Sequence, residues 1–190
     1  FINNSKVIDI DNKKSSSIKS MFKNEKMNAI KRKELAFLFA ENSIGFIFFY
    51  IYLLKKNYTI LLVNGENYNQ LKKNYKPSIE VLPNFFIRKF NYEKKYIKKK
   101  KYNFVMIKNT NSNNYKIHKE ICLLLSTSGS TGSKKFVKIS YENLESNIKA
   151  IINSLDLMST DSTITTMPPE YSYGLSVINT HLNVGATIYL

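Results

Sequence analysis

A short segment rich in hydroxyl groups and glycine is the part of the sequence best suited to chemistry. It reads Thr127-Ser128-Gly129-Ser130-Thr131-Gly132-Ser133-Lys134-Lys135. Its glycines permit positive φ values, with which a loop can turn its main-chain N–H groups toward a ligand. Hydroxyl donors suit phosphate oxygens, and the two lysines bring positive charge to the same place. The candidate phosphate ligands are Thr127, Ser128, Gly129, Ser130, Thr131, Gly132 and Lys135.

The residues before this segment distinguish a binding loop from a linker. Runs of Ser, Gly and Thr are commonly linkers. This one, however, directly follows the apolar run Ile121–Leu125, which predicts a buried strand. The segment is not a Walker A loop, since it lacks Gly, four residues and then Gly-Lys-Ser/Thr. Spacing and chemistry together favour an anionic ligand at the end of a strand.

The segment resembles the phosphate-binding signature of the adenylate-forming (AMP-binding) superfamily, Thr-Ser-Gly-Ser/Thr-Thr-Gly-x-Pro-Lys-Gly. That superfamily contains acyl-CoA synthetases, nonribosomal peptide adenylation domains and luciferases. Six consecutive positions agree, and Lys135 falls at the family's lysine. Two positions depart: Lys134 replaces the usual proline, and Phe136 replaces the usual glycine.

Further segments after the loop resemble the same family. Residues 167–175, Met-Pro-Pro-Glu-Tyr-Ser-Tyr-Gly-Leu, are similar to its Pro-x-x-His-x-x-Gly-Leu segment, with Tyr171 where many members have histidine. In the family that segment borders the acyl substrate and the nucleotide, so the resemblance places Tyr171 and Gly174 beside them. Without the resemblance, the same residues indicate a rigid turn entering a helix. Residues 140–144 match the family's Thr/Ser-x-x-Asn-Leu helix start, and residues 184–190 resemble its Gly-Ala-Thr turn into a strand.

The resemblance implies the N-terminal part of an ATP-dependent ligase. In the family a carboxylate attacks the α-phosphate of ATP, pyrophosphate leaves, and the acyl group of the acyl-adenylate usually passes to CoA or a carrier-protein pantetheine. The loop would bind the β- and γ-phosphates with Mg²⁺, whose glutamate ligand we expect beyond Leu190. The adenine motif, the ribose-binding aspartate and the catalytic lysine are expected there too. No catalytic or metal-binding residue is therefore assigned here, and we expect these 190 residues alone to be inactive.

Upstream of the loop, the apolar pattern predicts an α/β fold with a parallel sheet. Residues 35–40 and 58–63 are expected strands, joined by a helix from Ser43 to about Lys56. A strand, a helix and a strand within about thirty residues form a βαβ unit, which places the strands parallel. A helix at 68–75 and a strand near 79–82 are expected to follow.

Downstream of the loop, a short strand at 136–139 is expected to lead into a helix capped by Ser140. The apolar residues of that helix recur at helical spacing, and we expect this face to pack on the sheet. They are Leu144, Ile148, Ile151, Ile152 and Leu155. The predicted domain division is a poorly defined segment at 1–33, mobile around Ser15–Ser17, followed by a partial AMP-binding domain at 34–190.

The chain carries a formal net charge of +15, and its strongest basic run is Lys94–Lys101. Tyrosines 92, 96 and 102 are interleaved with this run, a pattern that a module binding single-stranded nucleic acid would also show. We favour the interpretation that this basic run is a solvated loop or helix face. A nucleic-acid-binding module and an inactive truncated remnant of a ligase remain the alternatives to a ligase.

Three further features bear on the cellular compartment, on metal binding and on membrane insertion. The single cysteine, Cys122, lies in the expected strand as a core thiol without an internal disulfide, which favours a reducing cytoplasmic setting. His118 has no Cys or second His nearby in the sequence, so no metal site is expected there. The apolar run 44–54 is shorter than the ~20 residues of a membrane span. The sequence begins without methionine and stops at Leu190 within the apolar run 186–190. We therefore expect the gene to continue beyond Leu190.

Overall fold

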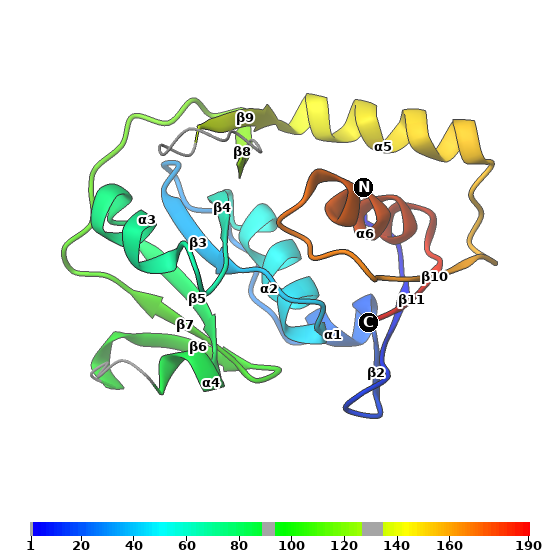
Figure 1. Ribbon diagram of the computed structural model, residues 1–190, viewed down its shortest axis with the longest axis horizontal. Helices are drawn as coiled ribbons and strands as arrows, with labels where there is room; N and C mark the ends of the chain where they lie inside the picture. Colours follow the sequence, from blue (N-terminus) through cyan, green and yellow to red (C-terminus); the bar gives the residue numbers. More distant parts are fainter. Residues whose placement is uncertain (1, 89–93, 127–134) are drawn as a thin grey trace.

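The architecture is built around a seven-stranded sheet (Figure 1). The computed structural model describes residues 2–88, 94–126 and 135–190. The strand order is β6-β7-β5-β3-β4-β8-β9. In chain order the strands are β3 (Leu35–Phe39), β4 (Thr59–Val63), β5 (Ile79–Pro83), β6 (Ile97–Lys101), β7 (Phe104–Lys108), β8 (Ile121–Ser126) and β9 (Phe136–Ser140). The four central strands run parallel, which confirms the predicted α/β class, and β6, β7 and β9 add antiparallel strands at the two edges.

A smaller sheet joins the two ends of the chain. Its order is β10-β11-β1-β2, with β11 parallel to both of its neighbours. Its strands are β1 (Lys6–Asp9), β2 (Lys14–Ser17), β10 (Ser162–Ile164) and β11 (Thr187–Tyr189). Val7 lies opposite Ile188 in this sheet, and both side chains are fully buried. The small sheet thus includes strands from both sides of the division that we predicted at residue 33, and that division stays a prediction.

The serine run near the N-terminus is ordered, which corrects the expectation of a mobile stretch. Ser15 and Ser16 pair with β1, and Ser17 caps the helix α1 (Ile18–Phe22) by accepting a hydrogen bond from the main-chain N–H of Ser20. These residues are held by main-chain hydrogen bonds to β1. Because serine side chains are polar, the sequence shows no apolar pattern that would predict this strand.

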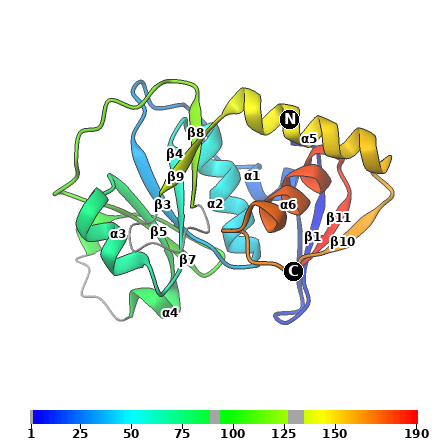
Figure 2. The ribbon, with the colours of Figure 1, turned by 45° about the horizontal axis from the view of Figure 1, so that its top comes forward.

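The apolar helix α2 (Ile44–Lys55) lies between the two sheets in both views (Figure 2). It begins where Ser43 accepts a hydrogen bond from the N–H of Phe46 at 3.1 Å, as an N-cap does. Every side chain from Ile44 to Leu54 is buried, since the helix contacts β3 and β4 of one sheet and β1 of the other. A Cβ at Gly45 would lie 2.6 Å from the carbonyl oxygen of Tyr102, so only glycine permits this close approach. None of the helices in the described part of the chain is long and apolar enough to cross a membrane.

The basic run is an edge strand, and this corrects the expected solvated loop or helix face. After the 3₁₀ turn Lys94–Tyr96, the run forms β6 beside β7. Lys101 forms an ion pair with Glu25 at 2.9 Å, and Lys99 pairs with the same carboxylate. Burial raises the pKa of Glu25, but hydrogen bonds from both lysines outweigh it and hold that pKa below its usual value. Two charges of the run are therefore compensated within the fold.

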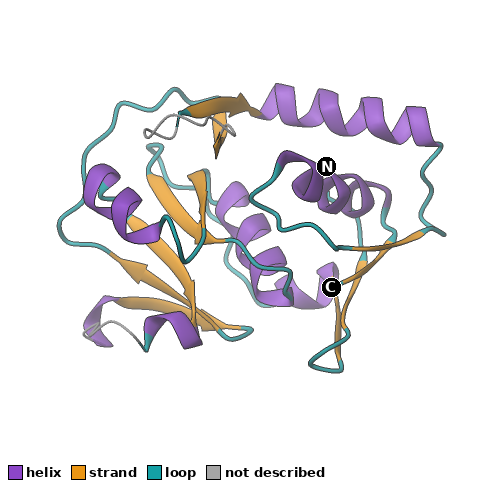
Figure 3. Ribbon diagram, viewed as in Figure 1, coloured by secondary structure: helices purple, strands orange, loops and turns teal. Residues whose placement is uncertain are grey.

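The long helix α5 (Tyr141–Leu155) runs past the edge of the large sheet and packs on α6 (Ser172–Val184) (Figure 3). This corrects the expectation that its apolar face would pack on the sheet. The helix α5 follows β9, which is the edge strand of the large sheet. Beyond its first turns, α5 therefore extends past that sheet. Leu144 and Ile148 are buried, whereas Leu155 is 64% exposed. The remaining helices are α3 (Tyr68–Tyr75) and α4 (Asn84–Ile87).

Cys122 is a buried core thiol, as predicted, and it should make stability depend on pH. Its side chain is fully buried in β8, and burial raises the pKa of the thiol from its ordinary value near 9 to about 11. Between these values the thiol ionises in the unfolded chain but not in the folded one, so stability falls as pH rises. We expect the wild type to lose about 2 kcal/mol more than Cys122→Ala between pH 8 and pH 11. Urea unfolding across this range measures the difference, and parallel pH profiles would contradict it.

Candidate functional site

The predicted phosphate-binding segment is bracketed by two paired strands. β8 and β9 pair antiparallel, with Ser126 opposite Phe136. Lys135 is exposed and directly precedes β9. The other predicted ligands lie outside the described residues, and their role stays a prediction: Thr127, Ser128, Gly129, Ser130, Thr131 and Gly132. The described strands therefore fix where the segment leaves and rejoins the large sheet.

The segment leaves the sheet at the carboxyl ends of its parallel strands. β3, β4 and β8 run parallel, so the residues that follow them meet at one edge. In open α/β sheets that edge is where ligands bind. Asn42, after β3, donates from Nδ2 to the carbonyl oxygen of Thr165 at 3.0 Å. Asn64, after β4, donates from Nδ2 to Glu170 Oε1 at 3.2 Å. These two bonds hold the second segment of interest, residues 165–174, against the same edge.

Asn64 is itself held by a reciprocal turn. Its Oδ1 accepts from the N–H groups of Glu66 and Asn67, and Asn67 Oδ1 accepts from the N–H of Asn64 at 3.0 Å. Because Oδ1 is committed to the turn, Nδ2 points outward to Glu170. Asn42, Asn64 and Glu170 were not among the predicted site residues. Asn-Gly is a common turn dipeptide, so the turn at Asn64 has a local cause, whereas its partner Glu170 lies 106 positions away.

Gly174 and Tyr171 lie where α6 begins. Tyr171 is the N-cap residue, its N–H donates to the carbonyl oxygen of Pro168 at 3.2 Å, and its side chain is 55% exposed. Gly174 is buried, and a Cβ there would lie 2.5 Å from the carbonyl oxygen of Pro168 and 2.7 Å from that of Met167. Glycine at 174 thus allows the first turn of α6 to pack directly on the preceding main chain. Tyr171 stays exposed at the same end of the helix.

A cavity of about 450 Å³ lies between α5, α6 and the β8–β9 hairpin. Its lining residues are Leu123, Leu125, Ile139, Asn143, Leu144, Asn147, Ile151, Ser172, Tyr173, Leu175, Ser176 and Asn179. Leu125 is two residues from Thr127, and Ser172 follows Tyr171, so the cavity adjoins both candidate segments. Its described lining is apolar with several amides and hydroxyls, and no charged side chain is among it.

The two histidines lie apart from this cavity. His118 is exposed, and its Nδ1 accepts a hydrogen bond from the N–H of Glu120 at 3.3 Å. His181 is buried on α6, where Nδ1 lies 2.8 Å from the carbonyl oxygen of Val177. Within residues 2–88, 94–126 and 135–190 there is no cluster of three or more His, Cys, Asp or Glu side chains that could hold a metal.

Comparison with known proteins gives one family and many similar folds. The sequence model of the AMP-binding enzyme family matches residues 30–190, and no curated protein matches the sequence. ATP-bound MatB from Rhodopseudomonas palustris is similar at 13% identity and a TM-score of 0.69, over 98% of this chain and 42% of that one.

Two structures with a bound acyl-adenylate are similar as well. The fatty acyl-adenylate ligase from L. pneumophila, in complex with acyl adenylate and pyrophosphate, matches at 15% identity and a TM-score of 0.67, over 98% of this chain and 36% of that one. The o-succinylbenzoate CoA synthetase from Bacillus subtilis, in complex with its acyl-adenylate intermediate, matches at 15% identity and a TM-score of 0.62, over 97% and 51%. The chain thus spans about 42% of the first similar structures.

Proposed function

The chain belongs to the AMP-binding enzyme family, and on that premise we propose that its full-length form is an ATP-dependent ligase of carboxylic acids. The observation that carries this proposal is the position of the 450 Å³ cavity. It lies between the β8–β9 hairpin, α5 and α6, and its lining includes Leu125 near the end of β8 and Ser172 at the start of α6. A substrate in this cavity would be adjacent to a nucleotide held by the loop after β8.

The reaction forms an acyl-adenylate. A carboxylate oxygen attacks the α-phosphorus of ATP, the bond from that phosphorus to the oxygen bridging to the β-phosphate breaks, and pyrophosphate leaves. The loop main chain, its hydroxyl groups and Lys135 would stabilise the charge that builds on the leaving pyrophosphate, as preorganised donors do. The thiol sulfur of CoA or of a carrier-protein pantetheine then attacks the acyl carbon, and AMP leaves as a thioester forms.

We assign the acid to the cavity and the phosphates to the loop. Apolar side chains such as Leu125 and Ile151 would contact the body of the acid, and Tyr171 and Gly174 would lie beside its reacting end. Mg²⁺ neutralises phosphate charge when bound with ATP, and we expect its protein ligand outside these 190 residues. We also propose a cytoplasmic location, on the strength of the single buried thiol at Cys122.

Carboxylate-dependent exchange of pyrophosphate into ATP tests the proposal. We expect the full-length protein to catalyse this exchange with at least one member of a panel of short and medium carboxylic acids. We expect residues 1–190 alone to show none. A full-length protein that binds ATP but catalyses no exchange with any acid would favour an inactive remnant of such a ligase.

Gly132→Ala tests whether the loop main chain contacts the phosphates. A methyl group at this position would restrict φ and crowd the ligand. We expect the affinity of the full-length protein for ATP–magnesium to fall at least about tenfold, or about 1.4 kcal/mol. The melting temperature without nucleotide should fall by only a few degrees, since a loop contributes little to the core. Calorimetric titration and a thermal melt give both numbers. A badly destabilised apo protein with unchanged ATP affinity would make Gly132 a structural turn residue only.

A further inference from the structure

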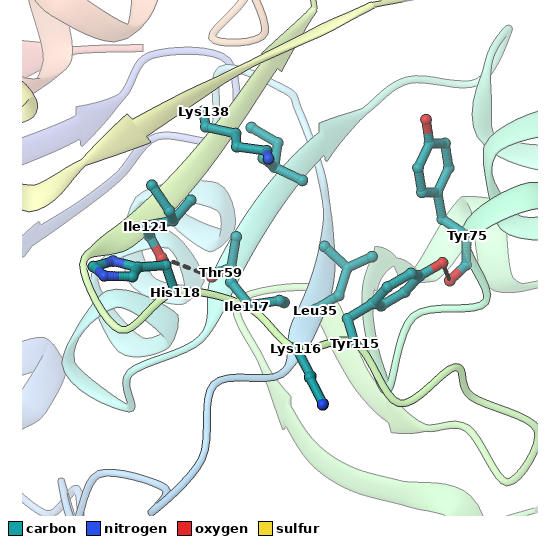
Figure 4. Close-up of a pocket in the computed structure, with 10 residues that line it drawn as sticks. Leu35, Thr59, Tyr75, Tyr115, Lys116, Ile117, His118, Ile121 and Lys138 are labelled. Carbon is teal, nitrogen blue, oxygen red and sulfur yellow. Dashed lines mark hydrogen bonds between the residues drawn. The ribbon is translucent and has the colours of Figure 1, made fainter.

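A second cavity, of about 320 Å³, is lined by the first residues of three parallel strands and by one face of the β8–β9 hairpin (Figure 4). Its lining residues are Leu35, Thr59, Tyr75, Tyr115, Lys116, Ile117, His118, Ile121, Leu124 and Lys138. Leu35, Thr59 and Ile121 are the first residues of β3, β4 and β8, whereas the loop follows the last residue of β8. Leu124 and Lys138 also line this cavity, whereas Leu123 and Leu125 line the 450 Å³ cavity, so the two cavities lie on opposite faces of the β8–β9 hairpin.

The walls of this cavity are held in place by the fold. Tyr115 donates from Oη to the carbonyl oxygen of Tyr75 at 2.8 Å, and its own carbonyl oxygen accepts from Arg32 at 3.2 Å. The ring of Tyr75 packs edge-to-face against Phe136, with 5.6 Å between centroids. Thr59 Oγ1 donates to the carbonyl oxygen of Ile121 at 2.7 Å, so its polar group is already satisfied. The space is thus preformed, and its walls are mostly apolar.

The charged side chains among the described lining residues are lysines, Lys116 and Lys138. Lys138 pairs directly with Leu124 across the β8–β9 hairpin, so the two side chains project from the same face of the sheet. In Figure 4 the Lys138 side chain lies across the top of the cavity, next to its apolar walls, whereas Lys116 points away. No acidic side chain is among the described lining residues, and no described residue forms an ion pair with Lys138.

We propose that this cavity binds a small organic anion with an apolar body, of the size of an aromatic acid. The rings and aliphatic side chains would contact the body, and Lys138 would pair with the charge. An apolar wall with one convergent charged group is the usual form of a small-molecule site. This proposal does not depend on the ligase activity, because the cavity shares no described lining residue with the 450 Å³ cavity assigned to the acid.

The test uses the full-length protein with methyl-labelled isoleucine and leucine. The probe is naphthalene-2-sulfonate, which carries no carboxylate for the ligase to activate, and naphthalene-2-methanol is the matched neutral compound. We expect saturable one-site binding of the sulfonate that shifts the methyl signals of Ile117, Ile121 and Leu124. Lys138→Gln should weaken sulfonate binding at least about threefold and change binding of the alcohol less than about twofold. Lys108→Gln, which removes an exposed charge from a strand away from the cavity, should change neither.

Two further arms locate the probe. Leu124→Phe should fill the cavity and remove binding of both compounds, with circular dichroism confirming that the variant folds. Saturating ATP–magnesium should leave the sulfonate affinity unchanged within about twofold. The proposal is overturned if the wild type shows no saturable shifts, or if the shifts fall on Ile139 and Ile151 of the other cavity. It is also overturned if ATP displaces the probe, if the alcohol binds as tightly as the sulfonate, or if both lysine variants weaken binding equally.

Discussion

Glu80→Ala should lower the free energy of unfolding by about 3–5 kcal/mol. Glu80 lies fully buried in β5, near the middle of the large sheet. Its carboxylate accepts hydrogen bonds from Tyr68 Oη, from Lys72 Nζ at 3.1 Å and from Asn109 Nδ2 at 2.6 Å. Alanine would take this acceptor away from three donors and leave a space in the core, and removing one partner of a buried ion pair is strongly destabilising. Urea unfolding of the two proteins at pH 7 measures the loss.

Two matched variants test whether the loss is due to the hydrogen bonds that the Glu80 carboxylate accepts. Glu66→Ala removes an exposed carboxylate just before α3, the helix that carries Tyr68 and Lys72. It should change the unfolding free energy by less than about 0.5 kcal/mol. Glu80→Gln keeps the shape of the side chain and one acceptor oxygen. Its loss in unfolding free energy should therefore fall between those of Glu66→Ala and Glu80→Ala. A Glu80→Ala protein as stable as the wild type would show that the buried carboxylate adds nothing to the fold.

Lys135→Ala in the full-length protein should lower carboxylate-dependent exchange of pyrophosphate into ATP by about 100- to 1000-fold. Losing one preorganised donor to the charge of the transition state typically costs this much. Lys135 is exposed and lies directly before β9, so its loss should leave the folded core intact. The exchange rate at saturating ATP, measured beside a thermal melt, separates loss of catalysis from loss of structure.

Lys134→Ala is the matched control for Lys135. It removes the same charge one residue earlier, at a position where the resemblance places a proline without a charged role. We expect its effect on exchange to be less than about tenfold, since a charge without a direct contact to the phosphates acts on them only weakly. Equal losses at the two lysines, or a larger loss at Lys134, would mean that the segment has been aligned with the family signature in the wrong register.

Some elements could be predicted because their cause is local. The continuous apolar run from Ile44 to Leu54 predicted a buried helix, and Ser43 marked its first turn. The runs that became β3, β4 and β8 were predicted for the same reason, since a strand buried on both faces is apolar throughout. Glycine at 174 was singled out through the resemblance, and the close approach of Pro168 supplies the physical reason for it.

Other elements could not be predicted because their partners lie far along the chain. Ser15 and Ser16 form a strand only because β1 is beside them, and β1 in turn pairs with β11, more than 170 residues away. Lys99 and Lys101 look solvated in the sequence, yet both reach Glu25. The face of α5 is apolar in the expected helical pattern, but a pattern does not say whether a sheet or another helix covers it.

For the candidate site, the sequence by itself determined the parallel strands that lead into the loop. It predicted an anionic ligand at the loop and, through the resemblance, the roles of Tyr171 and Gly174. Only the tertiary structure decided that residues 165–174 lie against the carboxyl ends of β3 and β4, through Asn42 and Asn64. It also decided that a cavity opens between α5 and α6 at that place. The reason is physical: propensity, capping and apolar periodicity act over a few residues, whereas a hydrogen bond between side chains 106 positions apart exists only after the chain has packed.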